Sequence, residues 1–518
     1  MFQIESKSNE RSNPVKKYDV IIIGSGSGNI VLDAALKQGL KCAQIEKGRF
    51  GGTCLTRGCI PTKVMVTAAD YLREMDKFEK IGINTGSASI NWETVSQRVW
   101  EKINESNDVL SYYQAAKNLD IYQGIGYFTR EKVIQIALND GTLSEEITAD
   151  KIFIAAGAHT NVPQIDNLES VGYITSESFF GEKYPKTPYK SLVILGGGPI
   201  GTEFSHIFSA AGTQVTLVQR NTRLLVKEDD EISAQILKSL RNLGTIVLLN
   251  HTLSAVRVEN GEKVLTFIEK TTKECTEIRA EEIMLAAGIQ PNTNLLQLEN
   301  TTIETDERGF IRTNEFLETT APNIWAFGDV NGKAPFRHKA NYEAEILAHN
   351  LFNNHKPENW RWARYDIIPA VTFTYPQVAH IGLTEPQAIK EGYAIHTAKH
   401  HYSSTAKGFA MGFDPGDEDD GFVKIVVDKK TNAILGIHII GPHASILLQP
   451  FINLMNAGKA RVTPINKDIG SDTVKKLRAA KLTRNLNPHS IISISETMTP
   501  HPSLSEVVMW IQYYLESE

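Results

Sequence analysis

The chain has 518 residues, of which 41% are hydrophobic and 22% are charged, and its 54 basic and 60 acidic residues give a net charge of −6. This composition excludes a disordered or collagen-like chain, and the length predicts three or four domains. The acidic balance argues against broad nucleic-acid binding, which needs a basic surface. No apolar run approaches the roughly 18 residues that span a bilayer, and residues 1–17 lack the apolar core of a signal peptide. We therefore expect a cytoplasmic protein with no nucleic-acid or membrane partner.

Residues 18–23, YDVIII, are typical of a strand that is buried on both faces. A glycine turn, GSGSGN, follows from Gly24, and then come a helix and a second strand that ends at Glu46. Glycines such as Gly24 and Gly26 let the backbone approach a pyrophosphate at a helix N-terminus, and the carboxylate accepts hydrogen bonds from ribose hydroxyls. Asn29 stands where a third glycine normally allows close helix–strand contact. The pattern predicts a dinucleotide site.

A second turn of the same kind begins 172 residues later, within SLVILGGGPIGTEFSHIF, and has the full GxGxxG spacing through Gly196, Gly198 and Gly201. Counted from the glycine that ends each helix, Gln219 stands where the first site has Glu46, and Arg220 and Arg223 follow. A carboxylate favours a free ribose 2′-hydroxyl, whereas arginine accommodates a 2′-phosphate. We therefore expect FAD at the first site and NAD(P)H, with a preference for NADPH, at the second. The alternative for the two arginines is a solvated strand end.

Two of the four cysteines lie close together. Cys54 and Cys59 share the segment GGTCLTRGCIPTK, whereas Cys42 and Cys275 stand alone and are expected to be packed thiols. In a regular helix, Cα atoms five residues apart are roughly 8–9 Å from each other, beyond the limit of about 7 Å for a disulfide. A bridged pair therefore requires an irregular chain, which the neighbouring glycines allow.

The alternatives for this cysteine pair are a zinc site, a structural disulfide or two unrelated buried thiols. Zinc needs two further ligands, and no second Cys/His pair has suitable spacing, so no metal is predicted. Structural disulfides are rare in cytosolic proteins. A thiolate at a helix start has a lowered pKa, because the aligned peptide dipoles favour negative charge there. Redox catalysis is the favoured interpretation.

A thiol–disulfide centre also needs a base, and the segment TMTPHPSLSEVV contains His501 and Glu506. A histidine held by a carboxylate can take a proton from one thiol and return it to another. The alternative is an ordinary surface histidine. Residues 456–497, which precede this segment, are rich in Lys and Arg, and we interpret them as a solvated helix face.

GGTCLTRGCIPTK, the two nucleotide turns, AFGDV and HPSLSE together resemble the class I FAD-dependent pyridine-nucleotide disulfide oxidoreductases. This family includes dihydrolipoyl dehydrogenase, glutathione reductase, mercuric reductase and mycothione reductase. The resemblance implies an α/β fold with two Rossmann-like dinucleotide-binding domains and a C-terminal α+β dimerisation domain. The expected boundaries are a polar tail at 1–17, an FAD-binding domain at 18–165 and 291–364, an NAD(P)-binding domain at 166–290 and a dimerisation domain at 365–518.

The resemblance also implies roles for single residues. Cys59 would lie beside the flavin and Cys54 would exchange with the substrate. His501, oriented by Glu506, would be the acid–base and would come from the partner subunit, so that an obligate homodimer is expected. The residues expected to contact the cofactors are Gly24, Gly26, Glu46, Lys47, Gly52, Thr53, Lys63, Gly157, Asp329, Gly196, Gly198, Gly201, Glu203, Gln219, Arg220 and Gly288.

Electrons would pass between nicotinamide, flavin, the cysteine pair and a small dithiol or disulfide. RHKANYEAE, from Arg337, resembles dihydrolipoyl dehydrogenases, whereas GSGSGN and IPTK resemble mycothione reductase. The first expectation is therefore dihydrolipoamide, with a lipoyl-bearing complex as a candidate partner. The alternative is an NADPH-dependent reductase of a low-molecular-weight disulfide. The chain departs from the family pattern at Thr56–Arg57, at Gln290 and in a longer segment before His501.

Two rival classes use the same nucleotide turns. A flavin NAD(P)H oxidase or transhydrogenase would work without disulfide chemistry, and a non-catalytic FAD-binding subunit would use the basic segment for docking. Neither class requires Cys54, Cys59 and His501 together, so their joint presence favours the disulfide oxidoreductase.

Overall fold

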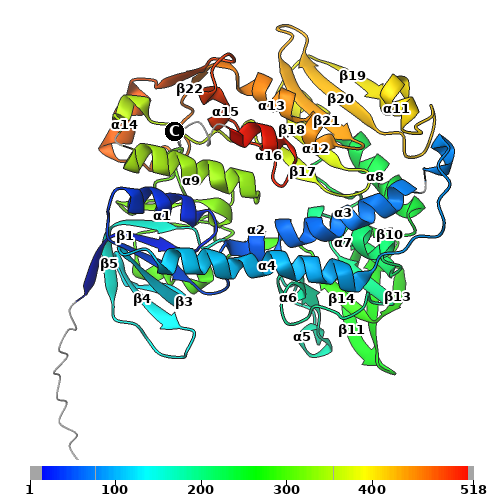
Figure 1. Ribbon diagram of the computed structural model, residues 1–518, viewed down its shortest axis with the longest axis horizontal. Helices are drawn as coiled ribbons and strands as arrows, with labels where there is room; N and C mark the ends of the chain where they lie inside the picture. The colour runs from blue at the N-terminus through cyan, green and yellow to red at the C-terminus, as the bar shows by residue number, and fades with distance from the viewer. Residues whose placement is uncertain (1–14, 76, 354, 512–518) are drawn as a thin grey trace, which may run out of the picture.

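The structure is a computed structural model that describes residues 15–75, 77–353 and 355–511. A mixed, mostly parallel sheet and a parallel sheet lie side by side, and a C-terminal antiparallel sheet with its helices covers them from one side (Figure 1). In these ranges, no helix is both long and apolar enough to cross a membrane. The arrangement confirms the expected fold class of two Rossmann-like units followed by a C-terminal α+β unit.

The first sheet is built around the apolar strand at the start of the described chain. This strand, β1, lies between β2 and β5 and runs parallel to both, while β3 continues the sheet beyond β2 and β16 beyond β5. Strand β4 is antiparallel to β3 and β5. The strands are β1 (Lys16–Ile23), β2 (Cys42–Glu46), β3 (Leu119–Arg130), β4 (Val133–Leu138), β5 (Ile147–Ile154) and β16 (Ile324–Ala326).

Helices cover one face of this sheet, where α1, α4 and α9 share a core with Val20 and Ile22 of β1. The other face carries Ile21 and Ile23 and packs against side chains of β3 and β4 and of residues 296–311, so β1 is buried on both sides. Figure 1 shows α9 lying along α1. These helices are α1 (Gly28–Lys37), α4 (Trp92–Gln114) and α9 (Arg337–Phe352).

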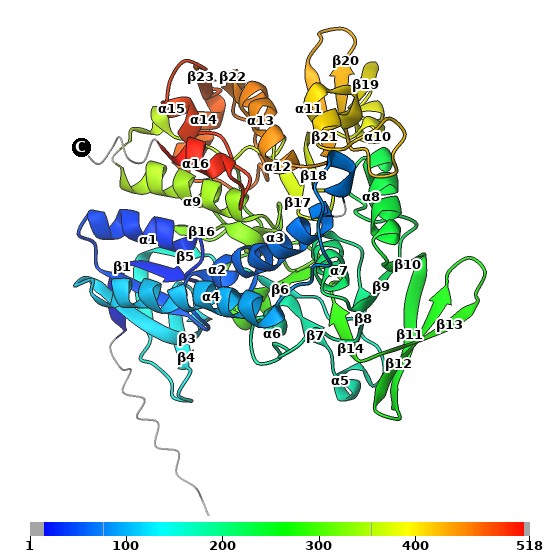
Figure 2. The same ribbon diagram turned by 45° about the vertical axis from the view of Figure 1, so that its right-hand side comes forward.

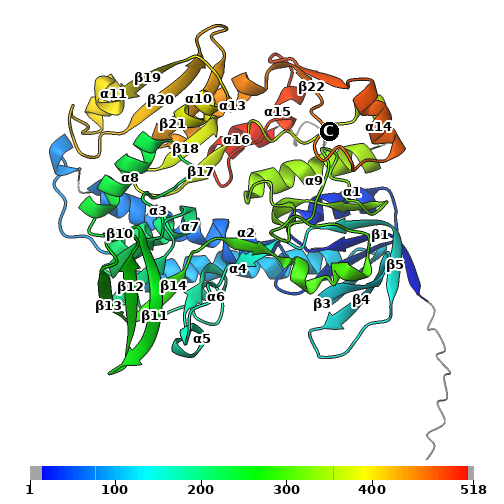
Figure 3. The same ribbon diagram turned by 180° about the vertical axis from the view of Figure 1, so that it is seen from behind.

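The second sheet has five parallel strands in the order β10-β9-β8-β14-β7, with α7 as the crossover after β8. A separate antiparallel sheet, β11 to β13, projects beside it, as the view from behind shows (Figure 3). The strands and helices are β7 (Ile174–Thr175), β8 (Ser191–Leu195), β9 (Gln214–Gln219), β10 (Ile246–Leu249), β11 (His251–Glu259), β12 (Glu262–Glu269), β13 (Cys275–Ala280), β14 (Glu282–Leu285), α5 (Leu168–Val171), α6 (Ser176–Phe179), α7 (Pro199–Ala210) and α8 (Asp230–Asn242).

The two glycine turns meet their steric requirement differently. In the second turn, a Cβ atom on Gly201 would lie 1.8 Å from the Gly196 carbonyl oxygen, so the position requires glycine. In the first turn, the close approach falls on Gly28, where a Cβ would lie 2.9 Å from Ile22. Asn29 is therefore tolerated, and its side chain accepts a hydrogen bond from Gln44 at 2.7 Å.

The C-terminal sheet is antiparallel with the order β17-β18-β21-β20-β19, and α12 and α13 pack against it through a shared apolar core. The elements are β17 (Ala370–Thr372), β18 (Val378–Gly382), β19 (Ile395–His401), β20 (Phe422–Asp428), β21 (Ile434–Ile440), α10 (Glu385–Lys390), α11 (Ala406–Ala410), α12 (Ala444–Leu447) and α13 (Gln449–Asn456).

The basic segment is not the solvated helix face that its sequence suggested. It forms a hairpin around one short helix, which lies over α9 (Figure 2). Arg478 and Arg484 are largely buried and form ion pairs with Glu315 and Glu496, although the lysines of the segment are exposed. The elements after α13 are β22 (Gly458–Arg461), α14 (Asp472–Ala479), β23 (Thr483–Leu486), α15 (Ile492–Ser495) and α16 (Ser505–Met509).

The two single cysteines differ. Cys42 is buried in β2, as expected of a packed thiol, and this burial raises its pKa to about 12. The same expectation was wrong for Cys275, which is exposed at the start of β13, an outer strand of the antiparallel sheet.

Candidate active site

One cavity of about 920 Å³ joins the two glycine turns to the paired cysteines and to His501. Nearly all of the residues expected to contact cofactors line it. The exception is Gly201, which is packed beneath the second turn. Of the predicted catalytic residues, Glu506 lies behind His501 and outside the lining. The lining residues from the predicted set are Gly24, Gly26, Glu46, Lys47, Gly52, Thr53, Lys63, Gly157, Gly196, Gly198, Glu203, Gln219, Arg220, Gly288 and Asp329.

The two cysteines lie on separate helical segments, so the chain has the irregularity that a bridged pair would require. Helix α2 (Gly52–Arg57) carries Cys54 and ends at Gly58, whose φ of −142° and ψ of −115° are not helical. Helix α3 (Cys59–Met75) then begins at Cys59. A Cβ on Gly58 would lie 2.9 Å from the Thr53 carbonyl oxygen, so this glycine permits the break that brings the sulfur atoms together.

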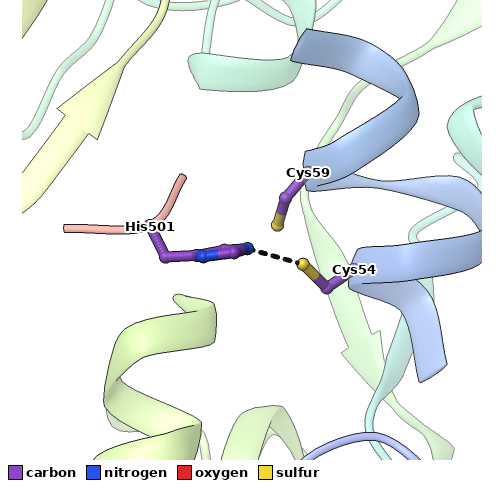
Figure 4. Close-up of side chains that lie close together, drawn as sticks. All are labelled: Cys54, Cys59 and His501. Atoms are coloured by element: carbon purple, nitrogen blue, oxygen red, sulfur yellow. Dashed lines mark hydrogen bonds between the residues drawn. The ribbon is translucent and has the colours of Figure 1, made fainter. Parts of the chain in front are cut away.

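Three reactive atoms meet at this break. The Sγ atoms of Cys54 and Cys59 and one ring nitrogen of His501 all lie within 4.8 Å of one another. Figure 4 shows the imidazole edge pointing at the Cys54 sulfur, with 3.1 Å between Nε2 and Sγ. Both cysteines are free thiols, and Cys54 is the more deeply buried. A closed zinc site takes four protein ligands, and in the described ranges this group supplies only three.

Glu506 fixes the orientation of the histidine ring. Its Oε1 lies 2.6 Å from Nδ1 of His501, and its Oε2 accepts a hydrogen bond from the Ser503 backbone N–H. Because a carboxylate is an acceptor, Nδ1 carries a proton and Nε2 is directed at Cys54. Nε2 can therefore take the proton of the Cys54 thiol.

The two thiols have opposite pKa shifts. The pKa of Cys59 is lowered to about 6, mainly by a hydrogen bond from Cys54 and further by the positive charges of His501, Lys63 and Arg337. The pKa of Cys54 is raised well above its usual range, because it donates that hydrogen bond and because it is buried. At neutral pH, Cys59 is therefore the thiolate and Cys54 is the thiol that needs a base.

Lys63 and Glu203 form a second charged pair on the cavity wall, at 2.7 Å. Lys63 projects from α3 and Glu203 from α7, so the pair connects the two nucleotide-binding units. The other carboxylate oxygen of Glu203 accepts a hydrogen bond from the Phe373 backbone N–H, and the Lys63 ammonium lies 4.5 Å from the centre of that phenyl ring.

The first half of the cavity fits the ADP and ribityl parts of FAD. Glu46 accepts hydrogen bonds from the Ser25 N–H and hydroxyl and from the Gly48 N–H, which leaves one of its roughly four acceptor positions for a ribose hydroxyl. Among the described residues, no hydrogen-bond donor contacts the Asp329 carboxylate, although burial raises its pKa. The ribityl hydroxyls could supply such donors.

The second half of the cavity has a basic end. Gln219 and Arg220 line it together with Lys227, and both basic side chains are exposed. Arg223 contributes less than expected, because its guanidinium forms an ion pair with Asp230 and lies outside the lining. The guanidinium of arginine and the ammonium of lysine bind the 2′-phosphate of NADPH more favourably than the 2′-hydroxyl of NADH.

Some residues at the site were not identified from the sequence. Arg337 begins α9 and lines the cavity. Its positive charge favours the thiolate form of both cysteines, although the pKa of Cys54 remains raised overall. In the sequence it appeared only as the first residue of the RHKANYEAE segment. Of the departures from the family pattern, Arg57 lines the cavity and pairs with Glu177 at 2.6 Å. Gln290 is exposed and lies outside the lining, where it donates to Asn161.

Within the single chain of this structure, Nε2 of His501 lies against Sγ of Cys54. The expectation that this histidine completes the site of a partner subunit concerns a second chain and stays a prediction.

The charge distribution predicts how substitution of Cys54 changes the titration of Cys59. Because the hydrogen bond from Cys54 is the largest cause of the low pKa, Cys54→Ala should raise the pKa of Cys59 above about 6. The control Cys54→Ser retains a hydroxyl donor and should keep most of the lowering. Ultraviolet thiolate absorbance against pH measures both, and equal midpoints for wild type and Cys54→Ala would contradict the assignment.

Comparisons with known proteins agree with this geometry. The family model described as pyridine nucleotide-disulphide oxidoreductase matches residues 18–360, and the model for the dimerisation domain of the same family matches residues 368–471. Mycothione reductase of Mycobacterium tuberculosis is 33% identical over 86% of this chain and 94% of its own length. Dihydrolipoyl dehydrogenase of Bacillus subtilis is 29% identical over 95% of this chain and 96% of its own.

Among solved structures, the HOCl-induced flavoprotein disulfide reductase RclA from Escherichia coli superposes with a TM-score of 0.72. It is 28% identical, and the match covers 85% of this chain and 93% of that one. The resemblance found in the motifs is thereby confirmed, and the chain belongs to the pyridine nucleotide-disulphide oxidoreductase family.

Proposed function

We propose that this protein is an FAD-dependent thiol–disulfide oxidoreductase that uses NADPH to reduce a small disulfide through Cys54 and Cys59. The observation that carries the proposal is the contact of 3.1 Å between Cys54 and His501 beside a second thiol of low pKa. An oxidase or transhydrogenase has no use for this arrangement. A non-catalytic subunit would not need it either.

The thiol chemistry follows from the two pKa shifts. His501 takes the proton of Cys54, and the Cys54 thiolate attacks one sulfur of the substrate, which forms a mixed disulfide and releases one thiolate. The imidazolium returns the proton to this leaving thiolate. The Cys59 thiolate then attacks the Cys54 sulfur, so that the second substrate sulfur leaves as a thiolate and a Cys54–Cys59 disulfide forms. The substrate gains two electrons and the cysteine pair loses two.

FAD, when bound, would accept a hydride from the nicotinamide and pass two electrons to the cysteine disulfide. The chain's own part is to hold and orient the two cofactors. Glu46 and Asp329 would hold FAD, and the Lys63–Glu203 pair would place a positive charge between the two nucleotide sites. The proposed domains keep the predicted boundaries. Residues 18–165 and 291–364 would bind FAD, residues 166–290 would bind NAD(P), and residues 365–518 would form the dimerisation domain.

The acceptor is proposed from the nucleotide site and the relatives together. Dihydrolipoamide and its disulfide, lipoamide, remain candidates, with a lipoyl-bearing complex as partner, because dihydrolipoyl dehydrogenases are among the relatives. A low-molecular-weight disulfide is favoured over lipoamide as the substrate. The basic end of the second nucleotide site suits NADPH, the electron donor for such a reduction, and mycothione reductase is 33% identical over 94% of its own length.

A homodimer is part of the proposal. The dimerisation-domain match over residues 368–471 supports it, as do the exposed apolar side chains of Leu504, Val507 and Val508 near the C-terminus. Apolar side chains gathered on one exposed helix commonly mark an interface.

The role of His501 can be tested with a matched pair of variants. His501→Gln should lower disulfide turnover by about 10²–10⁴-fold, the usual worth of a general base, while dye reduction by NADPH is retained. The control is His489→Gln, which removes an exposed histidine from the preceding segment and should leave both activities unchanged. Lipoamide, mycothione disulfide and oxidised glutathione serve as acceptors. Equal loss of dye and disulfide activity in His501→Gln would contradict the assigned role.

The nucleotide preference has its own test. Arg220→Ala should lower kcat/KM for NADPH by about 10–100-fold, the loss of one hydrogen bond to a charged group, and leave NADH nearly unchanged. Arg223→Ala is the control, because Arg223 pairs with Asp230 outside the cavity lining. An unaltered ratio of NADPH to NADH efficiency in Arg220→Ala would refute the 2′-phosphate argument.

A further inference from the structure

Arg337 is a charged residue of the cavity wall that the thiol chemistry leaves without a direct partner. Its side chain is half-buried and lines the cavity from the first position of α9. In the part of the chain that the structure describes, no carboxylate forms an ion pair with it and no acceptor receives a hydrogen bond from its guanidinium. A guanidinium has five donors, and those that lose water need acceptors in its place. The acceptors should therefore belong to a ligand of the cavity.

The position of the guanidinium identifies the part of the cavity that it faces. A Cβ atom on Gly26 would lie 3.7 Å from Nη1 of Arg337 and 3.7 Å from the Cα atom of Gly52. Gly26 belongs to the turn before α1, where the bare backbone permits the close approach of a pyrophosphate. Arg337 thus lies beside the stretch of the first nucleotide turn that is expected to face a diphosphate.

Two helices begin at this place. Helices α1 and α9 lie side by side (Figure 1), and the hydroxyl of Ser27, just before α1, donates a hydrogen bond of 2.8 Å to the side chain of Asn341 in α9. Neither helix has an acidic residue in its first turn, and neither has a side chain that caps its free N–H groups. The start of a helix carries partial positive charge. An anion near Gly26 would be stabilised by both helices.

The first turn of α9 is basic, which is the unfavourable sign of charge for the start of a helix. It begins with Arg337, His338 and Lys339. His338 is neutral, because its burial lowers its pKa to about 4, and Lys339 pairs with Glu343 at 3.0 Å. Arg337 is therefore the positive charge of this turn that no acidic side chain balances. Its placement is unfavourable by itself and becomes favourable when an anion binds.

The Cys59 thiolate is another anion of the cavity, but it is not the direct partner of Arg337. Arg337 lowers the pKa of Cys59 less than the hydrogen bond from Cys54 or the charge of Lys63 does, and no hydrogen bond joins the described side chains of Arg337 and Cys59. The charge of Arg337 also opposes the rise in pKa that burial causes at Asp329. The guanidinium thus acts on both the cysteine pair and the expected ribityl site, as a group placed between them.

We propose that Arg337 binds the diphosphate of FAD beside the glycine turn from which α1 begins. The inference rests on the proposed function only in taking FAD as the cofactor. The forked donors of a guanidinium match the oxygens of a phosphate, and such charge-assisted hydrogen bonds are stronger than neutral ones. Arg337 therefore holds the middle of the cofactor, whereas Glu46 and Asp329 hold its ribose and its ribityl chain.

The affinity of the holoenzyme for FAD tests this assignment. Arg337→Gln should raise the dissociation constant for FAD by about 10–100-fold, the usual worth of a hydrogen bond to a charged group. Equilibrium dialysis with detection of the free flavin by fluorescence measures this constant. The control is Arg98→Gln, which removes an exposed arginine of α4 outside the cavity lining and should leave the constant unchanged.

Equal dissociation constants for wild type and Arg337→Gln would overturn the inference and leave the proposed function intact. A wild-type protein that binds no FAD would overturn both. The two failures are therefore distinguishable without any measurement of disulfide turnover.

The salt dependence of FAD binding separates a phosphate contact from a structural role of Arg337. In wild type, raising NaCl from about 0.05 M to about 0.5 M should weaken FAD binding, because salt screens the attraction between guanidinium and phosphate. The weakening should be smaller in Arg337→Gln. Arg337→Lys keeps the charge, so it should retain the salt dependence and lose less affinity. Equal salt dependence in wild type and Arg337→Gln, or equal losses of affinity in the two variants, would overturn the inference.

Discussion

The stabilised negative charge on Cys59 is the interaction on which the rest of the site depends. A buried thiolate is unfavourable unless donors and positive charges compensate for its lost hydration. Here the Cys54 thiol donates a hydrogen bond, and Lys63 and Arg337 supply positive charge from two different parts of the chain. The same interaction separates the two thiols, since it makes Cys54 the one that must be deprotonated before it can attack a disulfide.

This requirement explains why distant elements converge. The break at Gly58 brings the two sulfur atoms together, and the Lys63–Glu203 pair ties α3 to the second nucleotide unit. The segment before His501 is anchored by the ion pair of Arg478 with Glu315 and by an apolar core that it shares with Phe316. Each of these features is unfavourable by itself, because it restricts the chain or removes charged groups from water. Together they fix the positions of the groups around the sulfur atoms of Cys54 and Cys59.

Local patterns in the sequence predicted much of this arrangement. The buried strand before Gly24, the second turn that ends at Gly201 and the cysteine pair each depend on neighbours within about a dozen residues, so their signals are visible in the sequence. The irregularity between Cys54 and Cys59 followed from helix geometry once the pair was interpreted as a redox disulfide. Glu506 could be paired with His501 because only five residues separate them.

The contacts that the sequence did not reveal are those between residues far apart in the chain. Arg337 reaches the cysteines because α9 begins at the cavity, about 280 residues after Cys59, and no local pattern encodes that meeting. Arg478 looked like part of a solvated basic face, since its buried partner Glu315 lies 163 residues earlier. The course of residues 457–500 likewise depends on long-range packing.

The most direct test of the central claim is a count of thiols before and after reduction by NADPH. The oxidised, FAD-loaded protein is unfolded under acid-quenched conditions and titrated with a thiol reagent. The sequence has four cysteines, and only Cys42 and Cys275 should react before reduction. Treatment with NADPH in the absence of oxygen should add two thiols, and peptide mapping should place them at Cys54 and Cys59. A count that NADPH leaves unchanged would contradict the account, because the cysteine pair would then not receive the electrons.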